Sequence, residues 1–166
     1  RMQSTFLTAS LASWGMIVVA PEHPSRDLTA VLGGTFGGDV TDSVDELLQS
    51  LDLILAAGDD PASPFSGRVD GEHVAAVGHS AGGGTVLAAA ADDRIDGYVG
   101  LASGRHDEST DMPSKPSLFV AGSLDGLISA EEITRPAYEA APSPSTLWVI
   151  EAAGHNAFDD FCTFGN

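Results

Sequence analysis

Short apolar segments recur along the chain, separated by longer stretches in which apolar residues follow a helical period. The segments of strand length are Met16–Ala20, Val74–Val77, Gly97–Ala102, Ser117–Gly122 and Thr146–Ile150. One longer stretch places apolar residues on a single helical face, at Val40, Val44, Leu47, Leu48, Leu51, Ile54 and Leu55. Strands that alternate with helices predict an α/β fold, a mostly parallel sheet flanked by helices on both faces.

Two loops rich in Gly, Ser or Pro punctuate this pattern. Gly33–Gly38 is predicted to be a flexible connector and not a phosphate-binding loop, because it lacks a lysine and no strand leads directly into it. Pro61–Gly67 is predicted to lead into the strand at Val74–Val77. Phe36 and Phe65 lie in these loops and are candidates for the wall of a substrate pocket; the alternative is that each only anchors its own loop.

The most specific motif is Gly78-His79-Ser80-Ala81-Gly82, a G-x-S-x-G pattern between a predicted strand and a helix of small residues at Gly83–Ala91. This context predicts a serine on a sharp strand-to-helix turn. We expect both flanking glycines to be needed, because a side chain at either would crowd the nucleophile or the strand behind it. Ser80 is therefore the candidate nucleophile.

A serine nucleophile needs a base and a group that orients the base, and the chain supplies both after Ser80. Asp125 follows the predicted strand at Ser117–Gly122, and His155 follows the one at Thr146–Ile150. Because the carboxyl ends of parallel strands meet at one edge of a sheet, we expect these three side chains to converge.

Other residues are weaker candidates for these roles. Asp107 and Asp111 are alternative acids, although they follow the preceding strand. His79, inside the motif, is expected to line the substrate pocket and not to act as the base. The remaining histidines, His23, His73 and His106, lie in a loop, at the start of a strand and in a polar loop.

With these motifs the chain resembles the α/β-hydrolase superfamily, in particular dienelactone-hydrolase-like esterases, platelet-activating-factor acetylhydrolase-like enzymes and cutinases. The resemblance also rests on Trp14–Pro21, Gly122–Asp125 and Gly154-His155, and it spans nearly the whole chain. It implies Ser80 as nucleophile, Asp125 as orienting acid, His155 as base and then acid, and the Ala81 N–H as an oxyanion donor. It implies no cofactor.

The family pattern also includes a strand between those matching Met16–Ala20 and Val74–Val77, followed by a second oxyanion donor, and neither is found here. Three explanations stay open. The chain is a piece of a longer hydrolase, incomplete at both ends; or it is a minimal hydrolase whose two strands pair directly; or a homo-oligomer completes the sheet. Residues 1–166 are expected to form a single catalytic domain, since 43% of them are hydrophobic.

The charge excludes some partners and leaves the source open. With 24 acidic and 7 basic residues the net charge is −17, which disfavours nucleic acids and anionic membranes. Compositional bias and adaptation to high salt both explain the acidity.

We expect no metal site and no membrane span, since no ligand spacing and no apolar run of about 20 residues occurs. The lone Cys162 has no partner for an internal disulfide, and location in the cytoplasm or outside the cell stays open.

These observations predict an esterase that acts through an acyl-enzyme on short-chain or polyester-like esters. No stretch of the chain is long enough for a large cap, so the site should be shallow and open. A peptidase is a weaker alternative, because nothing provides a peptide-recognition domain. From a different class, a non-catalytic remnant or binding scaffold on a hydrolase fold is the main alternative.

Overall fold

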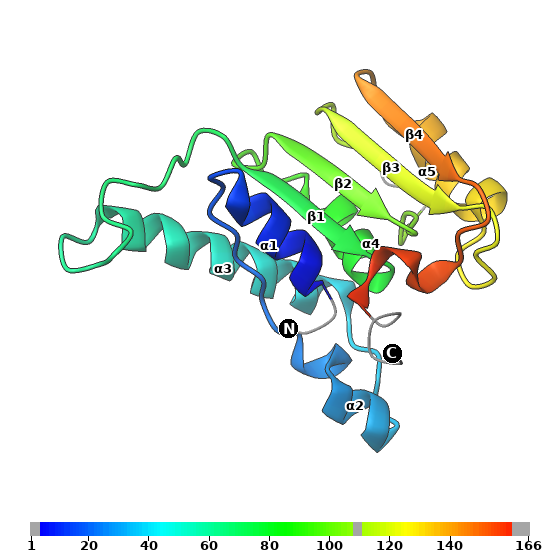
Figure 1. Cartoon of the computed structure of the whole chain (residues 1–166), viewed down its shortest axis with the longest axis horizontal. Helices are drawn as coiled ribbons and strands as arrows, with labels where there is room; N and C mark the ends of the chain where they lie inside the picture. Colours follow the sequence, from blue (N-terminus) through cyan, green and yellow to red (C-terminus); the bar gives the residue numbers. More distant parts are fainter. Residues whose placement is uncertain (1–3, 108–110, 161–166) are drawn as a thin grey trace. The chain divides into compact units, whose positions relative to one another are not determined.

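The computed structural model describes residues 4–107 and 111–160, and it contains two compact units, Arg1–Gly71 and Glu72–Asn166. Figure 1 gives the course of the chain through both. The single domain expected over residues 1–166 stays a prediction. Cys162 lies outside the described residues.

The first unit is helical. Its elements are α1 (Thr5–Ser13), the 3-10 turn η1 (Pro24–Arg26), α2 (Leu28–Gly33) and α3 (Val40–Asp59). The Asp39 carboxylate caps the N-terminus of α3, where it accepts a hydrogen bond from the Thr41 N–H at 2.9 Å. This bond lowers the pKa of Asp39. All seven apolar residues of the predicted helical face lie within residues 40–55 of α3, whereas Leu53, on another face, is 73% exposed. The predicted helix is thus confirmed.

The predicted strand at Met16–Ala20 is wrong, because this segment belongs to no helix or strand. Met16 is 56% and Val19 45% exposed. This segment is rich in β-branched residues, as strands are. The preference of these residues for strands comes from packing on a sheet and pairing with an adjacent strand, and composition alone does not supply that adjacent strand. The strands in the described part of the chain all belong to the second unit.

The second unit is built on a parallel sheet whose strands lie in chain order, β1-β2-β3-β4 (Figure 1). The strands are β1 (Ala75–His79), β2 (Gly97–Leu101), β3 (Ser117–Gly122) and β4 (Ser145–Ile150). Their registers align Val77 with Val99, Leu101 with Val120 and Gly122 with Ile150. The carboxyl ends of all four strands therefore lie at one edge. This parallel arrangement confirms the predicted α/β fold class.

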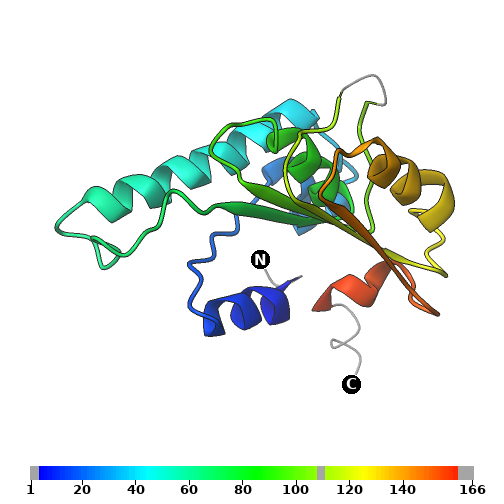
Figure 2. The same ribbon diagram turned by 90° about the horizontal axis from the view of Figure 1, so that it is seen from above.

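Helices α4 (Ala81–Ala89) and α5 (Arg135–Ala140) cover one face of this sheet, and the 3-10 turn η3 (His155–Phe158) lies on the other (Figure 2). A π-helical turn, η2 (Ala130–Thr134), leads into α5. On the α4 and α5 face, the fully buried Phe119 packs edge-on against Tyr98 and Tyr138, with 6.2 Å between ring centroids in each pair. On the other face, Phe158 packs with Ala102 and Val120, which fixes η3 on the sheet.

Strict alternation of strand and helix fails between β2 and β3. The described residues of this connection, 102–107 and 111–116, contain no helix. Pro113 and Pro116 lack the N–H that a helix needs, and the polar run after Ala102 has no apolar helical face. A local pattern of this kind favours a loop, so the described part of this connection adds no helix to either face of the sheet.

Candidate active site

Ser80 lies between the last residue of β1 and the first of α4, with φ at 56° and ψ at −122°. A positive φ is costly for any residue with a Cβ, and such strain collects at functional sites. Two backbone hydrogen bonds hold the turn: the Ser80 N–H donates to the Leu101 carbonyl at 2.9 Å, and the Ser80 carbonyl accepts from the Gly84 N–H at 3.1 Å. The serine is thus on the sharp strand-to-helix turn that the motif predicts.

The glycines around Ser80 do not have equal roles. A Cβ on Gly78 would lie 2.2 Å from the Gly82 carbonyl oxygen, so β1 and α4 approach closely only because Gly78 has no side chain. The expectation for Gly82 is wrong, since a Cβ there has no heavy atom within 4 Å. Gly83, which the motif does not include, is also constrained, because its Cβ would lie 2.4 Å from the Ser103 side chain.

Asp125 and His155 are brought together with Ser80. The Nε2 of His155 lies 3.0 Å from the Ser80 Oγ, and its Nδ1 lies 2.8 Å from the Asp125 Oδ2. An ionised carboxylate only accepts hydrogen bonds, so Nδ1 carries the proton and Nε2 is left to accept from the serine hydroxyl. The side chains of Ser80, His155 and Asp125 therefore lie together at the carboxyl edge of the sheet, as expected.

The Asp125 carboxylate is buried and well supplied with donors. Its side chain is 0% exposed, and its Oδ1 accepts from the N–H groups of Leu127 at 2.9 Å and Ile128 at 2.8 Å. Burial alone would raise the pKa of this carboxyl, but hydrogen bonds from Ile128, His155 and Leu127 together lower it. The group thus stays ionised beside His155, and its geometry is fixed by the backbone of its own loop.

Ala81 is the first residue of α4 and directly follows Ser80. The N–H groups of the first helical turn point out of the end of the helix, and the helix dipole favours negative charge there. The position of Ala81 therefore suits the oxyanion donor that the resemblance implies, which stays a prediction.

The three candidate pocket residues differ in their surroundings. Phe36 and Phe65 belong to the first unit and are 56% and 39% exposed. The His79 side chain is only 6% exposed and packs against His155 and Phe158, with ring centroids 4.7 and 6.1 Å away. Substrate contact by all three stays a prediction.

The other titratable candidates are placed elsewhere. His23 is paired with Glu46 in the first unit, and the His106 ring packs against Gly84, where an added Cβ would lie 2.5 Å from its Nε2. Among the described residues, the carboxylate that faces the His155 Nδ1 is that of Asp125, and not that of the alternative acids Asp107 or Asp111.

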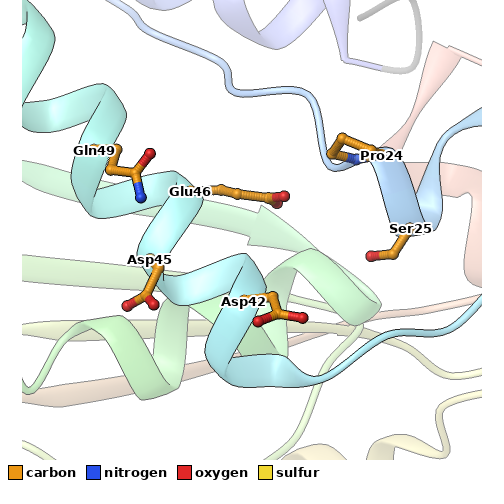
Figure 3. A pocket seen from close by; sticks show the side chains of 6 residues that line it. All are labelled: Pro24, Ser25, Asp42, Asp45, Glu46 and Gln49. Carbon is orange, nitrogen blue, oxygen red and sulfur yellow. The ribbon is translucent and has the colours of Figure 1, made fainter.

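One hollow in the first unit has a strongly acidic lining (Figure 3). It measures about 380 Å³ and is lined by Pro24, Ser25, Asp42, Asp45, Glu46 and Gln49. Figure 3 shows the Glu46 side chain extending from α3 toward Pro24 and Ser25. Ser80, Asp125 and His155 are not among these six residues, so the hollow contains none of the candidate catalytic groups.

Over residues 4–107 and 111–160, no three His, Cys, Asp or Glu side chains are grouped as a metal ion would require. Within those same ranges, no helix is long and apolar enough to cross a membrane. The expectations of no metal and no cofactor stay predictions.

Comparison with known proteins shows the family of this chain. A family model described as "PETase: PET hydrolase-like" matches residues 5–163. The chain is also similar to Cutinase est2 from Thermobifida alba, with 27% identity over 114 residues. That match covers 68% of this chain and 37% of the length of the cutinase. Because the family model matches almost the whole chain, the resemblance to cutinase-type α/β-hydrolases is confirmed, and the chain belongs to the PET hydrolase-like family.

Proposed function

We propose that this protein is a serine hydrolase of carboxylic esters, with Ser80 as nucleophile, His155 as general base and acid, and Asp125 as the group that orients His155. The observation that carries the proposal is the continuous chain of hydrogen bonds from the Ser80 Oγ through the His155 ring to the Asp125 carboxylate, at 3.0 and 2.8 Å. Membership of the PET hydrolase-like family supports the same chemistry.

In the first half of the reaction, the Ser80 Oγ attacks the ester carbonyl carbon while the His155 Nε2 takes the hydroxyl proton. Asp125 stabilises the imidazolium that forms. The carbonyl oxygen becomes an oxyanion, for which the Ala81 N–H at the start of α4 is the proposed donor. The protonated His155 then gives its proton to the leaving alcohol oxygen as the C–O bond breaks, which leaves an ester between Ser80 and the acyl group.

In the second half, His155 takes a proton from water, and the hydroxide oxygen attacks the acyl carbon. Collapse of this second oxyanion breaks the bond to the Ser80 Oγ, which recovers its proton from His155. The products are a carboxylic acid and the regenerated enzyme, so the cycle consumes one water and needs no cofactor.

We propose short-chain or polyester-like esters as the substrates. The support is the name of the matching family, that of a hydrolase acting on a polyester, and the name of the similar cutinase. Residues 1–166 would act as one catalytic domain, with all three members of the Ser80 constellation in the second unit. A homo-oligomer that extends the sheet at β1, one of its edge strands, remains part of the proposal.

The test is the intact mass of the protein before and after treatment with a fluorophosphonate, which labels only an activated serine. We expect a single adduct on the wild type and none on Ser80→Ala. Hydrolysis of p-nitrophenyl butyrate and of a soluble terephthalate diester should fall in parallel with labelling. A folded protein that takes up no label would refute the proposal and favour the non-catalytic scaffold instead.

A further inference from the structure

We propose that His79 is a positioning residue, whose imidazole fixes the backbone of the loop that carries His155. This inference rests on the proposed function, since it concerns how the base is held beside the nucleophile. It gives His79 a role in the geometry of the reaction, without contact with the reacting atoms.

The main observation is a hydrogen bond between two segments that are far apart in the sequence. The Nε2 of His79 lies 3.0 Å from the backbone carbonyl oxygen of His155, 76 residues away. A carbonyl oxygen only accepts, so His79 Nε2 carries the proton and donates it. Because His79 immediately precedes Ser80, this bond joins the residue next to the nucleophile to the residue that supplies the base.

The surroundings of His79 favour this role over a role in substrate contact. Its side chain is 6% exposed and packs against the rings of His155 and Phe158. On the other side of the ring, Nδ1 lies 4.0 Å from the carboxylate of Asp159, whose side chain is 0% exposed. A ring enclosed in this way has one orientation, which aims its Nε2 at the His155 carbonyl.

The charge state of His79 is consistent with a single donated proton. Burial lowers the pKa of this imidazole, and repulsion from a positive charge on His155 lowers it further, although the contact with the His155 carbonyl and the charge of Asp159 act in the opposite direction. His79 is therefore neutral at pH 7. In a neutral imidazole only one nitrogen carries a proton, and here it is the one that faces the His155 carbonyl.

Phe158 holds the end of η3 on the sheet, whereas His155 lies at its start, where the bond from His79 adds a second point of attachment. His155 opens the four-residue turn η3, in which the Ala157 N–H donates to the Gly154 carbonyl at 3.1 Å. Asp125 fixes the imidazole at Nδ1, but a displacement of the backbone would still move Nε2 away from the Ser80 Oγ. A misplacement of about 1 Å in a reacting geometry costs about 10²-fold in rate.

The test compares three substitutions in the full chain. His79→Gln keeps an N–H donor at about the distance of Nε2, and His79→Asn carries the same amide on a side chain one methylene shorter. His79→Phe keeps the ring volume and removes the donor. We expect kcat for p-nitrophenyl butyrate to fall by about 10²-fold in the Asn and Phe variants with KM nearly unchanged, and to stay within about threefold of wild type in Gln.

A second readout does not need activity. The His155 Nδ1 proton, held in its hydrogen bond to Asp125, gives a downfield resonance in the proton NMR spectrum. We expect this resonance to persist in His79→Gln and to broaden or vanish in His79→Asn and His79→Phe. If His79→Phe does not fold, as judged by circular dichroism, the comparison of His79→Gln with His79→Asn still tests the positioning role.

Several results would overturn the proposal. They are wild-type kcat in His79→Asn, equal losses in the folded Gln and Asn variants, or a loss confined to KM, which would make His79 part of the substrate pocket. If the wild type hydrolyses no ester but the resonance follows the expected pattern, the proposed function fails while the positioning of His155 by His79 stands. If the resonance is insensitive to all three substitutions, the positioning role fails.

Discussion

Alanine in place of Gly78 is expected to disrupt the turn that carries Ser80, whereas alanine in place of Gly82 is not. A Cβ on Gly78 would lie 2.2 Å from the Gly82 carbonyl oxygen, 2.4 Å from the Gly82 carbonyl carbon and 2.8 Å from the Gly83 nitrogen. These are backbone atoms of α4, which cannot rotate away as the end of a side chain can. The helix must move away from β1 instead.

The magnitude follows from that movement. Forcing one extra carbon into a well-packed site costs about 1 to 3 kcal/mol, and rigid backbone neighbours place this site at the upper end. At Gly82, within the first turn of α4, an added Cβ has no heavy atom within 4 Å. Alanine is favoured over glycine inside a helix by up to about 1 kcal/mol, so this control should be neutral or slightly stabilising.

The assay is equilibrium unfolding in guanidinium chloride, followed by circular dichroism. A loss of about 3 kcal/mol would shift the midpoint by roughly 0.75 M, and fluorophosphonate labelling of the same samples would report the loss of the Ser80 geometry. The reasoning would be refuted if Gly78→Ala were as stable as wild type. It would also be refuted if Gly82→Ala lost as much stability as Gly78→Ala.

Other substitutions test the pair of Asp125 with His155 and the core. Asp125→Asn should lower kcat by about 10⁴-fold, because an amide N–H facing Nδ1 stabilises the wrong imidazole tautomer; steady-state kinetics on a variant shown to be folded by circular dichroism would check this. Since the pKa of Asp125 is lowered in the folded protein, its ionised form stabilises the fold above the ordinary carboxyl range, and this contribution is lost as the pH falls through the lowered pKa. The difference in free energy of unfolding between wild type and Asp125→Asn should therefore shrink on acidification; a constant difference would count against it. Phe119→Ala should cost about 3 to 5 kcal/mol in urea unfolding, because the ring is fully buried, whereas Phe36→Ala, at a side chain 56% exposed, should change stability by less than about 0.5 kcal/mol.

The sequence carries most of the information about the Ser80 turn and its partners. The G-x-S-x-G pattern predicts a strand before Ser80 and a helix after it, and β1 and α4 are found there. The strand predicted at Ser117–Gly122 matches β3 residue for residue, because a continuous apolar run in a buried parallel strand is a strong local signal. The order of the strands then brings Asp125 and His155 to the edge where Ser80 lies.

The features that could not be predicted depend on contacts between distant residues. Met16–Ala20 has the composition of a strand, but composition cannot say whether a neighbour is present to pair with it. The need for glycine at Gly83 comes from Ser103, which lies in another segment. The burial of His79 likewise depends on a loop 76 residues away, so its motif alone suggested a pocket position.

The positive φ of Ser80 means that stability and catalysis make opposite demands on one residue. Only glycine adopts this conformation without strain, yet glycine has no hydroxyl to attack an ester. A lineage released from selection for catalysis would gain stability by replacing this serine with glycine, and a lineage that keeps the chemistry must keep the strain. For the same reason, alanine at this position retains the backbone strain and glycine relieves it, so the two inactive proteins would differ in stability.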